Sequence, residues 1–124
     1  MEEWELEFQW LQLRHRLKKL IDTSQLLDLK GVLFLIGVQE YGHVRKDFSK
    51  EEKRDLIHIA ACTLLEQEGY YDFVGRDDEG WPHFEIKKPF EVKGLNEQEN
   101  ILKTCALKYF KKLNEDPEIV KISN

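Results

Sequence analysis

The sequence has little cysteine, the residue with which small proteins form disulfides or bind structural metals. It contains two cysteines, three prolines and one methionine in 124 residues. Two cysteines are too few for a disulfide framework, and Cys62 and Cys105 lie too far apart in the chain for a metal knuckle. Because both stand in apolar helical surroundings, we expect reduced, buried thiols.

Long apolar runs and basic leader segments are also missing. No apolar stretch approaches membrane-spanning length, and the first residues, MEEWELEF, are acidic where a signal peptide would be basic. No internal repeat, low-complexity segment or linker rich in proline, glycine and serine interrupts the chain. We therefore expect a cytoplasmic protein without a membrane segment.

An excess of positive charge is lacking as well, since the formal net charge is −5, which disfavours a phosphate-binding surface. Hydrophobic residues, at 41%, and charged residues, at 35%, are abundant, as is typical of a globular protein. A chain of this length can bury one core. We expect a single domain over residues 1–114 and a loosely ordered tail over residues 115–124.

The first predicted helix spans Glu3–Ile21. Acidic residues gather at its start and basic residues at its end, as the helix dipole favours. The alternation of apolar residues over Trp4–Trp10 leaves a short strand open as an alternative for that end. The expected buried stripe of the helix consists of Leu6, Trp10, Leu13, Leu17 and Leu20.

The second predicted helix runs from a cap at Ser24 to Tyr41. Its centre, Val32–Val38, is apolar on every side, so we expect burial on every side and the most buried helix of the fold. A buried strand over the same residues stays an alternative, because short apolar runs do not separate the two by period. Gly31 and Gly37 each cost about 1 kcal/mol in a helix, which indicates that neighbouring helices approach closely there.

The third predicted helix has the clearest start signal, a capping box formed by Ser49 and Glu52. Gly42 and Gly69 supply stops for the second and third helices. The fourth helix is expected to start at Asn96. Its expected buried stripe consists of Leu102, Cys105, Ala106, Tyr109 and Leu113.

Two segments rich in aromatic and β-branched residues, Tyr70–Val74 and Trp81–Ile86, predict strands joined by the polar turn Gly75–Gly80. Pro82 places the second strand at an edge. The predicted fold is mainly helical (α+β), with four helices and one two-stranded hairpin, at about residues 70–86, between the third and fourth helices. The order of the second helix, the third helix and the hairpin is that of a winged helix.

A winged-helix domain binds DNA through cations on its second motif helix and its wing. Between Ser49 and Gly69, however, three basic residues stand against five acidic ones, and in the turn Arg76 stands against three acidic residues. Both surfaces would repel phosphate, so nucleic-acid binding is the alternative function rather than the expected one. A basic stretch predicts the solvated face of the fourth helix, or else a docking surface for an acidic partner or RNA: Lys87, Lys88, Lys93, Lys103, Lys108, Lys111 and Lys112.

Two motifs, Glu40-x-x-His43 and Asp55-x-x-His58, place a carboxylate and a histidine on one helix face, as in some di-iron bundles. Gly42 interrupts the first motif, and the first and fourth helices offer no isolated inward carboxylate. A metal-binding bundle is therefore a minor alternative, and we predict neither a metal nor another cofactor. No nucleophile stands beside a base in a recognisable spacing, and no glycine-rich phosphate motif occurs, so catalysis is not expected.

The candidate partner-binding residues are Trp4, Phe8, Leu11, Trp81 and His83. The first three lie opposite the buried stripe of the first helix, where a second apolar surface needs something to cover it. The other two lie in the hairpin, where Trp81 is suited to wall a pocket. The function expected from the sequence is a small, cytoplasmic, non-catalytic interaction or structural module that binds a protein partner or its own copy through the first helix.

Overall fold

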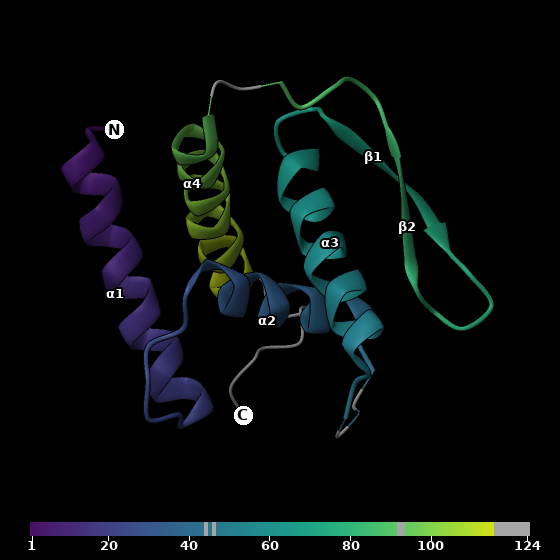
Figure 1. Cartoon of the computed structure of the whole chain (residues 1–124), viewed down its shortest axis with the longest axis horizontal. Coiled ribbons are helices and arrows are strands. Elements are labelled where there is room, and N and C mark those ends of the chain that lie inside the picture. The colour runs from purple at the N-terminus through teal and green to yellow at the C-terminus, as the bar shows by residue number, and fades with distance from the viewer. Residues whose placement is uncertain (44, 46, 92–93, 116–124) are drawn as a thin grey trace. The chain divides into compact units, whose positions relative to one another are not determined.

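The computed structural model describes residues 1–43, 45, 47–91 and 94–115. Within these residues the chain forms four helices and one antiparallel hairpin between the third and fourth helices, so the predicted mainly helical α+β fold is confirmed (Figure 1). The elements are α1 (Glu3–Ile21), α2 (Leu29–Tyr41), α3 (Lys50–Glu66), β1 (Tyr71–Arg76), β2 (Pro82–Ile86) and α4 (Gly94–Glu115).

The contacts divide the chain into two compact units. Unit 1 contains Met1–Val32 together with α4, and unit 2 contains Leu33–Glu91. The predicted tail over residues 115–124 lies outside the described residues, apart from Glu115, at which α4 ends.

In unit 1, α1 begins and ends at the predicted residues, which excludes the alternative of a strand over Trp4–Trp10. At its start, the backbone N–H of Glu2 donates to the side chain of Glu5 at 3.4 Å. At its end, Asp22 adopts a left-handed conformation with φ of 54°, and the N–H of Asp22 donates to the carbonyl of Lys18. Four residues of the predicted stripe are buried: Leu6, Trp10, Leu13 and Leu17.

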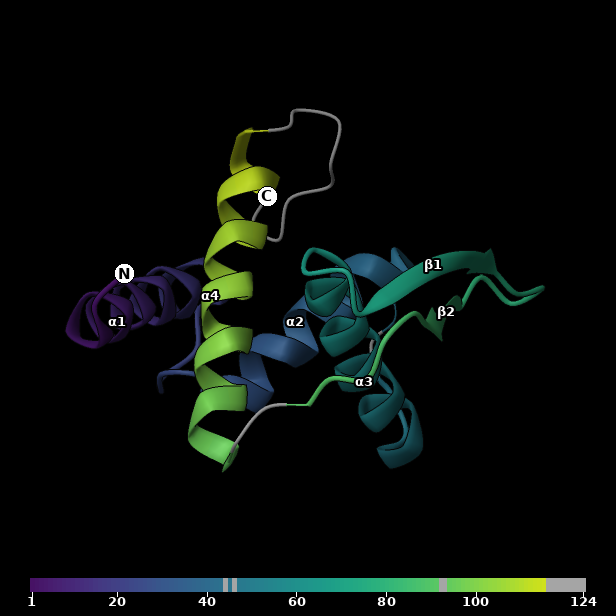
Figure 2. The ribbon, with the colours of Figure 1, turned by 90° about the horizontal axis from the view of Figure 1, so that it is seen from above.

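Leu20, the fifth residue of that stripe, was predicted wrongly, because its side chain is 42% exposed. In both views α1 and α4 lie side by side and cross one another (Figures 1 and 2). Helices that cross cover each other over a limited length, and Leu20 lies in the last turn of α1. Periodicity alone gives the face of a residue but not the length of the partner that covers it.

Helix α4 starts at Gly94, two residues before the predicted Asn96. Its buried face includes the predicted Cys105, Ala106 and Leu113, while Leu102 and Tyr109 are only half-buried. Phe110 is buried where Tyr109 was expected, and the sequence could not choose between two adjacent aromatic residues at the edge of one stripe.

Helix α2 begins at Leu29, so the predicted cap at Ser24 is wrong. Asp28 caps the helix instead, because its side chain accepts a hydrogen bond from the N–H of Gly31 at 2.9 Å. The guanidinium of Arg14 donates to the carbonyl of Leu27, just before the helix. The alternative of a buried strand over Val32–Val38 is excluded, and no residue from Gly31 to Tyr41 is fully exposed.

In unit 2, the second half of α2 packs closely on α3 at Gly37. A Cβ atom at Gly37 would lie 2.1 Å from the carbonyl oxygen of Leu56, so the predicted close approach of a helix is confirmed there. The same prediction is wrong for Gly31, whose nearest neighbours are side-chain atoms of Leu27 at 3.0 and 3.1 Å. Tyr41, Leu56 and Ile59 form a buried cluster. Half-buried residues pack around this cluster: Phe34, Val38, Phe48, Trp81 and Phe84.

The predicted capping box starts α3: Ser49 Oγ accepts from the N–H of Glu52 at 3.1 Å, and Glu52 accepts from the N–H of Ser49 at 2.8 Å. Gly69, with φ of 81°, lies just after the helix, where the N–H of Tyr70 donates to the carbonyl of Leu65. The predicted glycine stop is therefore in place. The N–H of Gly42 likewise closes α2 on Val38.

The hairpin runs alongside α3 (Figures 1 and 2). Phe73 pairs with Phe84 and Gly75 with His83, so Val74 is left as the extra residue of a β-bulge. Pairing continues beyond the bulge, with Arg76 opposite Pro82, so Gly75 and Arg76 belong to the strand rather than to the predicted turn. The φ of 131° at Gly75 is one that only glycine adopts readily.

Candidate functional site

A groove of about 520 Å³ lies between α3 and the hairpin, and we call it the α3–hairpin groove. The carboxylates of Glu52, Asp55, Asp77 and Glu79 line it, and no lysine or arginine of the described part of the chain does. The imidazoles of two histidines and the thiol of a cysteine contribute further polar groups. The other lining residues are His58, Ile59, Cys62, Trp81, Pro82, His83 and Phe84.

Helical spacing explains the α3 wall of the groove. Glu52, Asp55, Ile59 and Cys62 follow one another by three, four and three residues, so their side chains project from one face of the helix. The capping box at Ser49 fixes where this helix starts and hence which face it turns to the hairpin.

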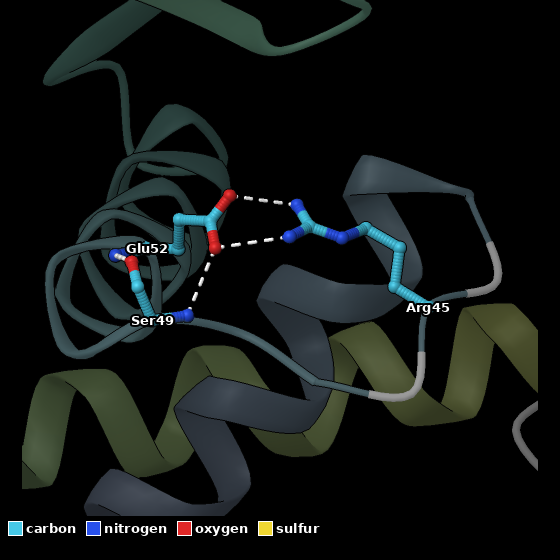
Figure 3. Close-up of polar contacts among 3 residues, drawn as sticks. All are labelled: Arg45, Ser49 and Glu52. Carbon is cyan, nitrogen blue, oxygen red and sulfur yellow. Dashed lines mark hydrogen bonds and ion pairs between the residues drawn. The ribbon is translucent and has the colours of Figure 1, made fainter.

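Glu52 at one end of the groove is held by two partners (Figure 3). Its carboxylate accepts two hydrogen bonds from the guanidinium of Arg45, at 2.7 and 3.0 Å, and one from the backbone of Ser49. The hydrogen bonds from Arg45, and next the one from the backbone of Ser49, lower the pKa of Glu52 to about 2. Hydrogen bonding to Glu52, and next to the side chain of Tyr41, raises the pKa of Arg45. The guanidinium also lies over the ring of Phe48, at 4.7 Å from its centroid. Because Arg45 and Glu52 form a bidentate ion pair, each neutralises the charge of the other within the fold.

Asp77 organises the hairpin side of the groove. Its Oδ1 accepts from the backbone N–H groups of Glu79 and Trp81, each at 2.9 Å, as in an Asx turn. Its Oδ2 lies 2.9 Å from Nε2 of His83, so that this nitrogen carries the proton and donates. The bond from His83, followed by the bond from Trp81, lowers the pKa of Asp77.

Trp81 is fixed from its other side by the core of unit 2. Its indole stacks on the ring of Tyr41 with centroids 4.4 Å apart. The guanidinium of Arg76 donates to the carbonyls of Glu40, Tyr41 and Gly80, which ties the turn to the end of α2. The stretch from Gly75 to Ile86 therefore closes the core and also forms one wall of a groove.

Arg76 bears directly on the winged-helix alternative. It is the basic residue of the predicted turn and lies at the end of β1, and its guanidinium donates to three backbone carbonyls. The charges that the turn offers to solvent are then those of Asp77, Asp78 and Glu79, which repel phosphate.

The structure brings Cys62 and His58 together, with Sγ and Nε2 3.5 Å apart. Residues four apart on a helix are neighbours whatever their chemistry, so this contact follows from the spacing of the two residues on α3. Burial raises the pKa of the Cys62 thiol to about 11, so the thiol stays protonated and is a poor nucleophile at neutral pH. Both residues of the pair line the groove.

The predicted surface on α1, which we call the aromatic face, consists of Trp4, Phe8 and Leu11. Their side chains are 68%, 57% and 42% exposed. Trp81 and His83, the other predicted partner-binding residues, both line the α3–hairpin groove in unit 2. The predicted residues thus form two surfaces on two units, and the carboxylates of the groove were not among them. The Asx turn at Asp77 is the signal in the sequence that could have found one of these carboxylates.

The two carboxylate–histidine motifs do not form a metal site in the part of the chain that the structure describes, where no three metal-ligating side chains come together. His43 instead packs edge-on against Tyr41, with ring centroids 4.8 Å apart. The basic stretch is partly used within the fold: Lys103 pairs with Glu7 at 3.1 Å, and the ammonium of Lys88 lies over the ring of Tyr70. Lys93 lies outside the described residues.

The chain matches no protein-family profile, no curated protein and no solved structure. Among the described helices, none has both the length and the apolar composition needed to cross a lipid bilayer. The function must therefore be argued from the two surfaces themselves.

Proposed function

We propose that the chain is a small, cytoplasmic, non-catalytic protein-interaction module that forms a homodimer through the aromatic face of α1. The observation that carries the proposal is the exposure of Trp4, Phe8 and Leu11, spaced by four and three residues on one side of a helix whose other side is buried. Contiguous exposed aromatic residues are rare on monomers and are enriched where interfaces gain their binding energy.

The charges of α1 favour a second copy as the occupant. Glu3 and Glu5 lie in its first turn, and Lys18 and Lys19 lie in its last turn. A two-fold axis near Leu11 would pair the helices antiparallel and place the acidic end of each copy beside the basic end of the other. The helix is therefore complementary to itself in both apolar surface and charge.

A cytoplasmic location is part of the proposal. Cys62 and Cys105 are both buried and form no disulfide, one in each unit. Buried thiols of this kind are compatible with a reducing compartment, which keeps thiols from forming disulfides between chains when the protein unfolds.

Light scattering on the parent and on two double variants tests the homodimer. Trp4→Glu with Phe8→Glu should halve the mass while helical circular dichroism is retained, because two buried carboxylates would oppose association. Gln9→Glu with Gln12→Glu adds the same charge on exposed positions of α1 beside the aromatic face and should leave a dimer.

Three outcomes would contradict the proposal. A parent that is monomeric at high concentration excludes the homodimer and leaves a foreign partner as the occupant. If both double variants dissociate equally, added charge rather than loss of the aromatic face is the cause. An unfolded Trp4→Glu, Phe8→Glu variant, with the Gln9 and Gln12 variant folded, would show that the face is part of the core.

A further inference from the structure

A second binding site is suggested by the α3–hairpin groove, whose walls are independent of α1. Its volume of about 520 Å³ falls within the range of ligand-binding clefts, which hold roughly 300–1,000 Å³. That space exceeds what one side chain fills, so the groove suits an extended segment rather than a single group.

The charge of the walls selects the kind of segment. Among the described residues, four carboxylates and no lysine or arginine line the groove, so a phosphate or an acidic peptide would be repelled. Glu52 and Asp77 are already engaged, by Arg45 and by His83 with the turn amides. Asp55 and Glu79 have side chains that form no ion pair with any described residue, and they lie on opposite walls.

The aromatic side chains of the groove are held by contacts within unit 2. The backbone N–H of Trp81 donates to the carboxylate of Asp77, and its indole stacks on the ring of Tyr41. Phe84 packs on Phe73 across the hairpin. A preformed aromatic wall costs little ordering entropy on binding. A planar cation can lie along such a wall while its N–H groups reach a carboxylate, which is a property of arginine more than of lysine.

We propose that the α3–hairpin groove binds a basic segment of a partner protein, with an arginine side chain lying between Asp55 and Glu79 and against Trp81. The groove lies wholly within unit 2, and α1 lies within unit 1. Binding of the basic segment therefore does not depend on the aromatic face of α1.

The test uses a short, capped glycine–serine peptide that carries two arginines, titrated into the full chain at low salt and followed by NMR. The indole N–H of Trp81 and the amide of His83 are expected to shift. A peptide with citrulline in place of both arginines has nearly the same shape without charge and should cause no shift.

Matched variants locate the charges. Asp55→Asn with Glu79→Gln should weaken binding about fivefold or more, since both proposed ion pairs are lost. Glu51→Gln with Asp78→Asn removes two charges from the same helix and the same turn at positions that do not line the groove, and should change the affinity less than about twofold.

The proposal is overturned by equal weakening in both double variants, by binding of the citrulline peptide, or by shifts that map away from the groove. It is also overturned if the linear polyamine spermine produces the same shifts at the same charge concentration, because charge alone would then be recognised. Since the citrulline comparison needs no variant, a folding defect cannot mask the result. The Trp4→Glu, Phe8→Glu variant should bind the peptide as the parent does, so a failed homodimer and a failed groove are distinguishable.

Discussion

At the scale of single residues, Gly37 and Gly31 stand in one helix but face different neighbours. A Cβ atom at Gly37 would meet the backbone carbonyl of Leu56 at 2.1 Å, and a backbone in a helix cannot move aside alone. A Cβ atom at Gly31 would meet Cδ2 of Leu27 at 3.0 Å, which can rotate away, and Cβ of Leu27 at 3.1 Å, which needs a small shift of the residue before the helix. The same substitution should therefore have different effects at the two positions.

Gly37→Ala is expected to lower the free energy of unfolding by about 1–3 kcal/mol, because overpacking outweighs the gain of about 1 kcal/mol in helix propensity. Gly31→Ala is the matched control, and we expect it to change stability by less than about 1 kcal/mol, since propensity offsets a small side-chain shift. Urea unfolding of both variants provides the measurement. Equal midpoints for parent and Gly37→Ala would show that α2 and α3 are not in tight contact.

At the scale of elements, the hairpin contains an unfavourable pair. Asp72 on β1 lies directly opposite Glu85 on β2. Like charges in this position destabilise a sheet, and a pair of opposite charges contributes roughly 0.2–1 kcal/mol. Glu85→Lys should therefore raise the free energy of unfolding by an amount in this range, as measured by urea unfolding at low salt.

A double-mutant cycle separates the pair from other effects of the lysine. Asp72→Lys should also stabilise, whereas Asp72→Lys together with Glu85→Lys restores repulsion and should lose the gain. If the double variant is as stable as either single variant, the cross-strand pair is not the cause.

Elements are also the scale at which the sequence is most informative. The capping box at Ser49 and the apolar spacing of α1 are local, so these helices could be predicted from periodicity and capping chemistry. The start of α2 was misplaced because Ser24 and Asp28 are both good capping residues. In the structure the side chain of Asp28 caps the helix, and Arg14 of α1 donates to the carbonyl of Leu27 just before it. That bond joins residues 13 apart in the chain, which no local pattern records.

The candidate site shows the same limit. Trp81 and His83 could be named from the sequence because a large aromatic residue and a histidine stand together just after the predicted turn. That Asp55 lines the same groove as these two residues could not be predicted, since it depends on how the hairpin packs on α3. The exposure of Trp4 follows from counting along one helix, and for that reason the aromatic face was the more predictable of the two surfaces.

At the scale of the whole molecule, α2 belongs to both compact units. The boundary falls between Val32 and Leu33 inside one continuous helix, and both residues are buried. Unfolding either unit should therefore remove part of the helix that contributes buried residues to the other. This is the physical basis for expecting residues 1–114 to behave as a single domain.

We expect both units to unfold in one cooperative transition, which tryptophan fluorescence can test because Trp10 lies in unit 1 and Trp81 in unit 2. A variant with Trp4 and Trp81 changed to Phe reports on unit 1, and a variant with Trp4 and Trp10 changed to Phe reports on unit 2. For each variant, the unfolding curve followed by fluorescence should coincide with the curve followed by circular dichroism on the same variant. A fluorescence transition that precedes the loss of helicity in either variant would show that the units unfold separately. In that case α2 would connect two domains instead of forming part of one.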